Sequence, residues 1–227
     1  MSHFIHTEAD LDTGLAALVA ADPRMAGVLS TAGRPALRRR EGGFAGLAAI
    51  VVSQQLSTAS AAAILGRLQA AYDPLDAEAL RRARKDRLQR IGLSGPKIRA
   101  LKEIAKVISS GALDPNGLGE READDAHRAL VAVHGIGPWT ADIYLLACLG
   151  HSDAWPAGDL ALQEAARLAF KLPARPTTKE MGPLADIWRP WRAVAARVLW
   201  TYYRAVKGRD AAPIQLKTNQ PKMKRRS

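Results

Sequence analysis

Apolar residues recur at helical spacing along most of this 227-residue chain, and that pattern constrains the fold more than any other feature. Leu11, Leu15 and Leu18 lie on one face of a helix that ends before Pro23. The same reasoning predicts further helices over residues 44–52, 58–68, 76–89, 97–109, 123–133, 138–149, 159–170 and 187–206. No segment has the regular alternation of a half-buried strand, and the connections are short. We therefore predict an all-α protein.

The composition agrees with a helical fold and excludes several kinds of site. Apolar residues make up 48% of the chain and aromatic residues only 5%, with alanine abundant, and Ala and Leu form helices more readily than strands. The single cysteine, Cys148, rules out a disulfide framework, a four-cysteine zinc site and a four-cysteine iron–sulfur cluster. Its apolar neighbours indicate a core residue. No stretch has the pattern of a signal peptide or a membrane span, so we expect a cytoplasmic protein.

The net charge of +11 is concentrated in two zones. Residues 81–106 hold ten Lys and Arg against two acids, and residues 207–227 hold seven against one. Two basic zones on a nearly neutral body suggest a polyanionic partner whose phosphates they bind. The alternatives are a solvated helix face and a disordered tail, and for the tail disorder is favoured because it has no apolar period. We expect one domain over residues 1–206 and a basic, disordered tail over 207–227.

A helix–turn–helix passage over about residues 125–149 is the most specific signal in the chain. It contains Val-His-Gly-Ile-Gly-Pro-Trp-Thr, in which Gly135 and Gly137 turn the chain and Pro138 begins a new helix. The glycines permit a positive φ and let a phosphate approach the main chain. The first-turn N–H groups of the new helix are unsatisfied and attract an anion. Many inter-helix turns contain Gly-x-Gly, so the motif indicates a phosphate site only together with the residues that follow it.

That context is the Trp-Pro-Ala-Gly-Asp-Leu segment that follows, which contains Asp159. Taken alone, Asp159 is an ordinary helix N-cap. Together the hairpin, the apolar helix and the Pro-x-Gly-Asp loop resemble the helix-hairpin-helix (HhH-GPD) DNA glycosylase superfamily. The residues of these motifs resemble its alkylpurine branch, the AlkA-like DNA-3-methyladenine glycosylase II type. Three further segments match in the family's order, and the resemblance runs from about residue 20 to 205; they are residues 50–63, residues 92–97, and residues 188–200.

The resemblance implies two helical lobes flanking a cleft that holds the hairpin. It implies a monofunctional enzyme of base excision repair that acts on double-stranded DNA containing damaged bases. The expected substrates are alkylated purines of the 3-methyladenine and 7-methylguanine type, and the product is an abasic site. The protein is expected to be a bacterial monomer associated with the nucleoid, with no membrane partner and without the additional β-rich N-terminal domain of many relatives.

Asp159 corresponds to the family's catalytic carboxylate, which stabilises the positive charge that develops on the sugar and orients water. Bifunctional relatives carry a lysine where this chain has Trp139, and a lysine is needed for the Schiff base that leads to strand cleavage. No lyase activity is therefore expected. The resemblance assigns Trp139, Trp200 and Tyr144 to a base pocket, where an aromatic ring attracts a cationic base. For Trp200 a purely structural role in the core is an equal alternative.

The remaining assignments concern DNA contact and also come from the resemblance. Gln55 or its neighbour Leu56 is expected to fill the gap left by a flipped base. The alternative is that Gln54 and Gln55 only cap the adjoining helices. The residues expected at the DNA backbone are Gly135, Gly137, Thr140, Lys97 and Arg99. No cofactor is expected to be required, but Na⁺ or K⁺ could be held at the hairpin by the main-chain carbonyls of Val131, Val133 and Ile136.

Two other functions stay open at the level of sequence. One is a glycosylase for other damaged bases, such as hypoxanthine, etheno-adenine or an oxidised purine. The commonest enzymes of that kind have a lysine in the hairpin or the cysteines of an iron–sulfur cluster. This chain has neither, which counts against them. The other is a non-catalytic module that binds DNA through the hairpin, although such a module does not need the Pro-x-Gly-Asp loop.

Overall fold

A computed structural model describes residues 4–208, and within them the all-α prediction is confirmed. Extended pairing in this range is limited to one isolated bridge between Phe4 and His151. The tail predicted over residues 207–227 lies outside the described residues apart from its first two positions. None of the helices in residues 4–208 combines the length and the apolar character that crossing a membrane requires.

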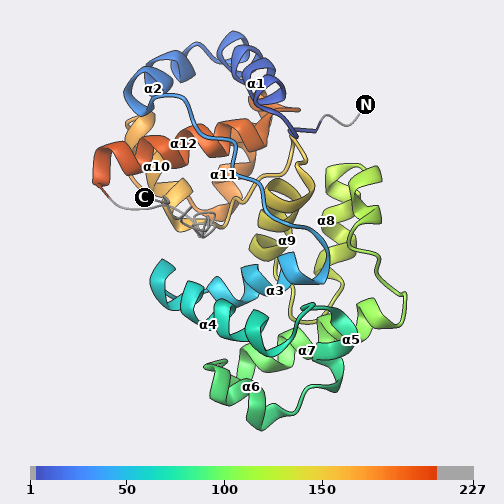
Figure 1. The fold of residues 1–227 in the computed structure, drawn as a ribbon. Helices are drawn as coiled ribbons and strands as arrows, with labels where there is room; N and C mark the ends of the chain where they lie inside the picture. The colour runs from blue at the N-terminus through green and yellow to red at the C-terminus, as the bar shows by residue number, and fades with distance from the viewer. Residues whose placement is uncertain (1–3, 209–227) are drawn as a thin grey trace, which may run out of the picture.

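The helices form two groups that we call the terminal lobe and the central lobe (Figure 1). The terminal lobe unites both ends of the described chain: α12 packs against α1, α2 and α10. Its helices are α1 (Glu8–Ala21), α2 (Arg24–Ala32), α10 (Leu160–Ala169), α11 (Thr178–Ala185) and α12 (Arg192–Lys207), with a 3₁₀ turn at Asp186–Trp188. Helices far apart in sequence therefore share one core.

The central lobe contains the intervening helices, arranged around α3 and α7. Its elements are α3 (Gly43–Ser53), α4 (Thr58–Ala71), α5 (Ala77–Arg82), α6 (Lys85–Ile91), α7 (Gly95–Ser109), a 3₁₀ turn (Gly117–Glu120), α8 (Ala123–Val131), α9 (Pro138–Tyr144) and a π-helical turn (Leu145–Leu149). Nearly all of α3 is buried, which explains why its sequence is apolar on every side. Helices α8 and α9 pack together as the predicted hairpin.

Two of the predicted helices need correction, and two observed helices were not predicted. The single basic helix expected over residues 76–89 is two helices, because Ala83 and Arg84 adopt extended ψ values of 137° and 139°. The break lets α5 pack on α7 while α6 packs on both α4 and α7. Helices α2 and α11 were not predicted, and the last helix begins at Arg192 instead of residue 187. Pro23 directly precedes α2, and Pro183 lies inside α11. Because proline commonly ends or interrupts a helix, neither segment was predicted to be helical.

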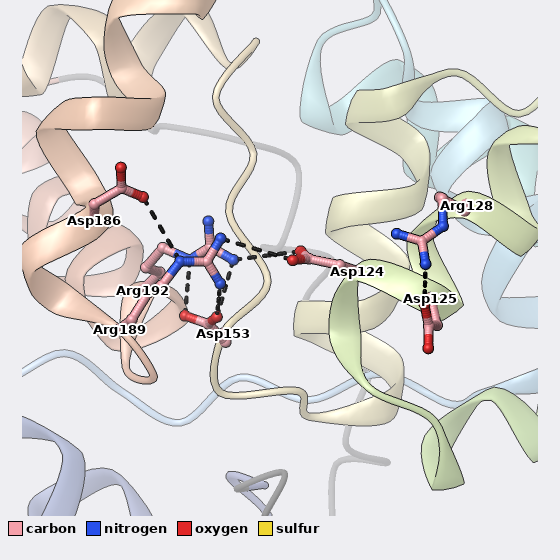
Figure 2. Close-up of polar contacts among 7 residues, drawn as sticks. All are labelled: Asp124, Asp125, Arg128, Asp153, Asp186, Arg189 and Arg192. Atoms are coloured by element: carbon pink, nitrogen blue, oxygen red, sulfur yellow. Dashed lines mark hydrogen bonds and ion pairs between the residues drawn. The ribbon is translucent and has the colours of Figure 1, made fainter.

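A cluster of ion pairs joins the lobes near the start of α12 (Figure 2). Arg192 binds Asp153 with two hydrogen bonds of 2.7 and 2.9 Å, and Arg189 binds the same carboxylate. Asp124 reaches from α8 in the central lobe to within 3.6 Å of Arg192 and 3.7 Å of Arg189. Asp186 adds a contact to Arg189 at 3.6 Å.

Candidate active site

Asp159 lies at the N-cap of α10 and is 6% exposed. Its Oδ1 accepts a hydrogen bond of 2.8 Å from the main-chain N–H of Leu162, so the N-cap interpretation of the sequence is correct. The preceding loop is held in a turn, because the N–H of Asp159 donates to the carbonyl of Pro156 and Gln163 Nε2 donates to that of Ala157. The carboxylate is thus attached to the start of a rigid helix.

Two tryptophan N–H groups also donate to the Asp159 carboxylate. Trp139 Nε1 lies 2.9 Å from Oδ2, and Trp200 Nε1 lies 3.1 Å from Oδ1. Trp139 comes from α9 of the central lobe, whereas Trp200 comes from α12 of the terminal lobe. Trp200 is buried, as expected of a core residue, and its assignment to a base pocket stays a prediction. Three donors from three helices fix the orientation of this carboxylate.

The hairpin between α8 and α9 has the geometry that its glycines suggest, but each glycine has a different reason. Gly135 has a φ of +96°, and a Cβ there would lie 2.8 Å from the Cα of Ala100 in α7. This glycine is therefore required by the turn, as the sequence indicates, and also by packing on α7, which the sequence did not indicate. Gly137 has a φ of −83° and is exposed, and a Cβ there would meet no atom within 4 Å. Both glycines are exposed, but only at Gly137 is the direction of a Cβ open.

Arginines hold the far end of the helix that begins with the hairpin, and sequence reasoning missed them. Arg39 donates to the carbonyl of Cys148 at 2.9 Å, and the buried Arg197 donates to that of Leu146 at 3.1 Å. Burial lowers the pKa of Arg197 to about 10. These cations neutralise the carbonyl end of the helix that carries Trp139. The run Arg38-Arg39-Arg40 was the available signal.

The side chains of Lys97 and Thr140, two residues predicted at the DNA backbone, have partners inside the protein, and their contact with DNA stays a prediction. Lys97 Nζ donates to the carbonyls of Val52 and Gln54, at 2.7 and 2.8 Å, and burial lowers its pKa. It therefore caps the end of α3. The Thr140 hydroxyl is buried and accepts a hydrogen bond of 2.7 Å from Gln54 Nε2. Lys97 thus joins the end of α3 to α7, and Thr140 joins it to the hairpin helix α9.

Tyr144 also differs from its predicted place in the base pocket. It is fully buried, and its hydroxyl accepts from the N–H of Gly43 at 2.9 Å and donates to the carbonyl of Pro115 at 3.2 Å. Burial raises its pKa. The residue is part of the central-lobe core, where it connects α9 with the start of α3.

The predicted wedge residues lie at an exposed turn between α3 and α4. Gln55 has a φ of +55°, and Leu56 is 38% exposed. Gln54 is anchored by its bond to Thr140, so the tip of the turn is supported from below. No contact of the structure tests which residue enters DNA, and that assignment stays a prediction.

Arg99 is exposed and has no hydrogen-bond or ion-pair partner among the described residues, in keeping with its predicted role. Within residues 4–208, no group of three His, Cys, Asp or Glu side chains is placed to hold a metal ion. The hairpin cation was predicted to use main-chain carbonyls and stays a prediction.

Comparison with known families gives one match, over residues 48–191, to the family described as HhH-GPD superfamily base excision DNA repair protein. This range includes the hairpin and Asp159 and covers more than half of the chain.

Curated relatives carry related names. The chain is 35% identical over 213 residues to a probable bifunctional transcriptional activator/DNA repair enzyme AlkA of Mycobacterium tuberculosis, covering 85% of this chain and 40% of that protein. It is 32% identical over 97 residues to a DNA-3-methyladenine glycosylase of Bacillus subtilis, covering 43% of this chain and 32% of that protein. The chain thus spans about a third to two fifths of the length of these relatives.

Two solved structures match over almost their entire length. A DNA-3-methyladenine glycosidase from Bacillus halodurans has a TM-score of 0.77 and 26% identity, covering 94% of this chain and 97% of that one. A Schizosaccharomyces pombe 3-methyladenine DNA glycosylase in complex with abasic DNA has a TM-score of 0.75 and 26% identity, covering 86% and 97%.

Proposed function

The chain belongs to the HhH-GPD superfamily of base excision DNA repair proteins, and from this premise we propose that it is a DNA glycosylase for alkylated purines. Its partner is double-stranded DNA containing damaged bases of the 3-methyladenine and 7-methylguanine type. The names of relatives and of structural neighbours support this substrate class. The observation that carries the proposal is the Asp159 carboxylate, held by N–H groups of Trp139 and Trp200 beside the hairpin.

In the proposed reaction, water replaces the base at C1′ of the deoxyribose. The bond between the sugar and the base breaks, and the electron pair leaves with the base. Positive charge develops on the sugar, and the Asp159 carboxylate stabilises it and accepts a proton from the attacking water. An alkylated purine is already cationic, so it leaves readily, and the indole ring of Trp139 attracts it before cleavage.

The proposed product is an intact abasic site. Strand cleavage by a glycosylase needs an amine that forms a Schiff base with the sugar. The hairpin position offers the indole of Trp139, whose nitrogen is a donor only and is directed at Asp159. We therefore propose that the enzyme has no lyase activity.

DNA binding is proposed to use the hairpin and the turn between α3 and α4. The exposed Gly137 leaves room for a phosphate at the start of α9, where main-chain N–H groups are free of side-chain caps. Gln55 or Leu56 enters the base stack from the exposed turn. Lys97 and Thr140 support this arrangement from the interior.

A monovalent cation at the hairpin is a further part of the proposal. The carbonyls of Val131, Val133 and Ile136 would hold it, and carbonyl oxygens are suitable ligands for Na⁺ or K⁺. The Val133 carbonyl already accepts the N–H of Ile136 at 3.0 Å and retains a second lone pair. When bound, the cation supplies positive charge next to a docking phosphate.

Release of free base from methylated duplex DNA tests the proposal. The wild type should release 3-methyladenine and 7-methylguanine without nicking the strand. Asp159→Asn should bind DNA but release base at least about a hundredfold more slowly, because the amide cannot accept a proton. Full activity of this variant would remove Asp159 from the mechanism. Release of 8-oxoguanine instead of alkylpurines would overturn the substrate class, and nicking by the wild type would overturn the absence of lyase activity.

A further inference from the structure

The ten cations of residues 81–106 differ in whether they have a hydrogen-bond or ion-pair partner within the protein. Four are paired with the carboxylates of Glu78 or Asp86, namely Arg81, Arg82, Arg84 and Arg90. Three donate to main-chain carbonyls, namely Arg87, Lys97 and Lys102. Within the described residues, Lys85, Arg99 and Lys106 have no hydrogen-bond or ion-pair partner. These three charges are available to a ligand.

Two of the three free cations line a single hollow at the start of α7. Its lining is Lys85, Gly95, Ile98, Arg99, Lys102, Glu103 and His134. The buried Ile98 contributes an apolar wall, and Glu103 is the one acid of the lining against three cations. Lys106, one turn beyond Lys102, is not part of it. We call this feature the α7 hollow.

The α7 hollow is continuous with the hairpin. His134 belongs to the hairpin turn and lines the hollow, and the next residue, Gly135, packs directly on Ala100 of α7. The first turn of α7 strengthens the positive character of the hollow. Its N-cap, Ser94, makes no side-chain hydrogen bond to the helix, so the N–H of Gly95 keeps its capacity to donate.

We propose that the α7 hollow binds a phosphate of the DNA backbone as a second anchor beside the hairpin, through Lys85 and Arg99. The inference rests on the proposed function in that DNA is the partner. The occupant follows from charge: two unpaired cations, an uncapped helix start and a neighbouring hairpin favour a phosphate over any neutral ligand. It replaces the contact predicted for Lys97, whose ammonium caps α3.

Such an anchor contributes to affinity without reading sequence or damage. A phosphate contact adds about 0.9 to the magnitude of the slope of log K against log salt concentration. Lys85 and Arg99 do not contact Asp159 or its tryptophan donors, so their expected effect is on DNA affinity. The hollow should therefore influence binding to damaged and undamaged DNA equally.

The experiment compares Lys85→Ala, Arg99→Ala and the double variant with Lys106→Ala, which removes an unpartnered cation of α7 outside the hollow. Kd is measured for an undamaged duplex and for a duplex with an abasic-site analogue, over a series of KCl concentrations. The double variant should reduce the magnitude of the slope by about 0.9, which corresponds to one phosphate contact, and each single variant by a part of that, on both duplexes. Lys106→Ala should leave the slope unchanged. The control Lys106→Ala should also release base at the single-turnover rate of the wild type.

Unchanged slopes in the double variant would overturn the proposal. An equal loss in Lys106→Ala would also overturn it, because the effect would then come from overall charge. A change confined to the abasic duplex would overturn it as well, because a backbone anchor does not recognise damage. If the wild type released no alkylpurine but the Lys85 and Arg99 variants reduced the salt slope as expected, the glycosylase proposal would fail. The proposal of a phosphate site in the α7 hollow would still hold.

Discussion

Asp159 is both the cap of a helix and the carboxylate on which two tryptophan donors converge. Its Oδ1 caps α10 through the N–H of Leu162, and the same carboxylate is held by Trp139 and Trp200. A cap residue has a fixed main chain, and two indole donors fix the side chain as well. Preorganisation of this kind is what a group needs to stabilise charge that exists only in the transition state.

Replacing Trp139 with Phe should separate stacking from orientation. The ring that attracts a cationic base is kept, but the hydrogen bond to Asp159 Oδ2 is lost. Hydrogen bonds to charged groups are worth about 1.5–3 kcal/mol, so the single-turnover rate of base release should fall by about 10- to 100-fold. The Kd for DNA carrying an abasic analogue should change little.

Trp200→Phe is the matched comparison, because Trp200 donates to the other carboxylate oxygen at 3.1 Å. Its rate should also fall, accompanied by a lower Tm, since Trp200 is buried in the terminal lobe. Rates equal to that of the wild type in both variants would show that the tryptophan donors do not orient Asp159.

Asp142 offers a prediction on pH. Burial raises its pKa well above the usual value, and the contact of Asp142 to His127 at 3.5 Å brings no full charge, since burial lowers the pKa of that histidine. Arg192 partly opposes the effect of burial, and Asp124 adds to it. An acid whose pKa is raised by folding favours the native state while protonated, so its contribution declines as pH rises from about 3.8.

Asp142→Asn removes this titration and keeps the shape of the side chain. The variant should have a higher Tm than the wild type at pH 7–8, roughly neutral conditions in which the buried charge is most costly, and the difference should shrink toward about pH 4. Thermal unfolding across this range measures it. A lower Tm of the variant at every pH would mean that the charged form is net stabilised by its neighbours.

Residue roles were predictable where a local motif defines them and not where distant segments do. The hairpin and the Pro-x-Gly-Asp loop pointed to Asp159 and Trp139, which the structure brings together. Lys97 and Thr140 lie in matching motifs, yet their side chains contact Val52 and Gln54. A sequence contains no direct record of such contacts, because they depend on how α3, α7 and α9 pack.

At the scale of elements, the two hairpin glycines should respond differently to alanine. Gly135→Ala places a Cβ 2.8 Å from Ala100 and forces a non-glycine residue to a φ of +96°. We expect a loss of about 2 kcal/mol or more in the free energy of unfolding, measured by urea denaturation. DNA affinity should fall together with stability.

Gly137→Ala should spare the fold and impair binding. A Cβ at this position meets open space at an ordinary φ, so the cost should stay below about 1 kcal/mol. The added methyl group would occupy the side from which a phosphate approaches, so the Kd for duplex DNA should rise. If Gly137→Ala bound DNA normally, the phosphate would not dock at the start of α9.

Element boundaries show what periodicity can and cannot predict. Helices α1, α3, α4, α7 and α8 lie close to their predicted positions, because each buries one apolar face or is buried entirely. The break between α5 and α6 was invisible, since Leu80, Ala83 and Leu88 fit one continuous helix. Packing against two different partners, α7 and α4, decided between one helix and two.

At the scale of the whole molecule, the active site depends on the relation between two lobes. Trp139 is in the central lobe and Asp159 in the terminal lobe, so a small shift between the lobes would separate the donor from its carboxylate. The ion-pair cluster of Asp124, Asp153, Arg189 and Arg192 connects the same two lobes (Figure 2). It is therefore in a position to maintain the active-site geometry.

The members of this cluster should differ in their effects on stability and on catalysis. The Arg192 side chain is 9% exposed and binds Asp153 with two hydrogen bonds. Arg192→Met removes both bonds from the Asp153 carboxylate and should lower the free energy of unfolding by about 3 kcal/mol. Asp124 is 64% exposed and lies 3.6 Å from Arg192, so Asp124→Asn should cost less than about 1 kcal/mol.

Asp124→Asn is the more informative variant for the link between the lobes, because it loosens the contact between α8 and α12 while the fold survives. If that link sets the distance between Trp139 and Asp159, the rate of base release should fall several-fold at unchanged Tm and unchanged Kd for DNA. High salt should reduce the difference between the variant and the wild type, because an exposed pair is screened. A wild-type rate in Asp124→Asn would mean that the buried Arg192–Asp153 pair and the main chain hold the lobes without help from α8.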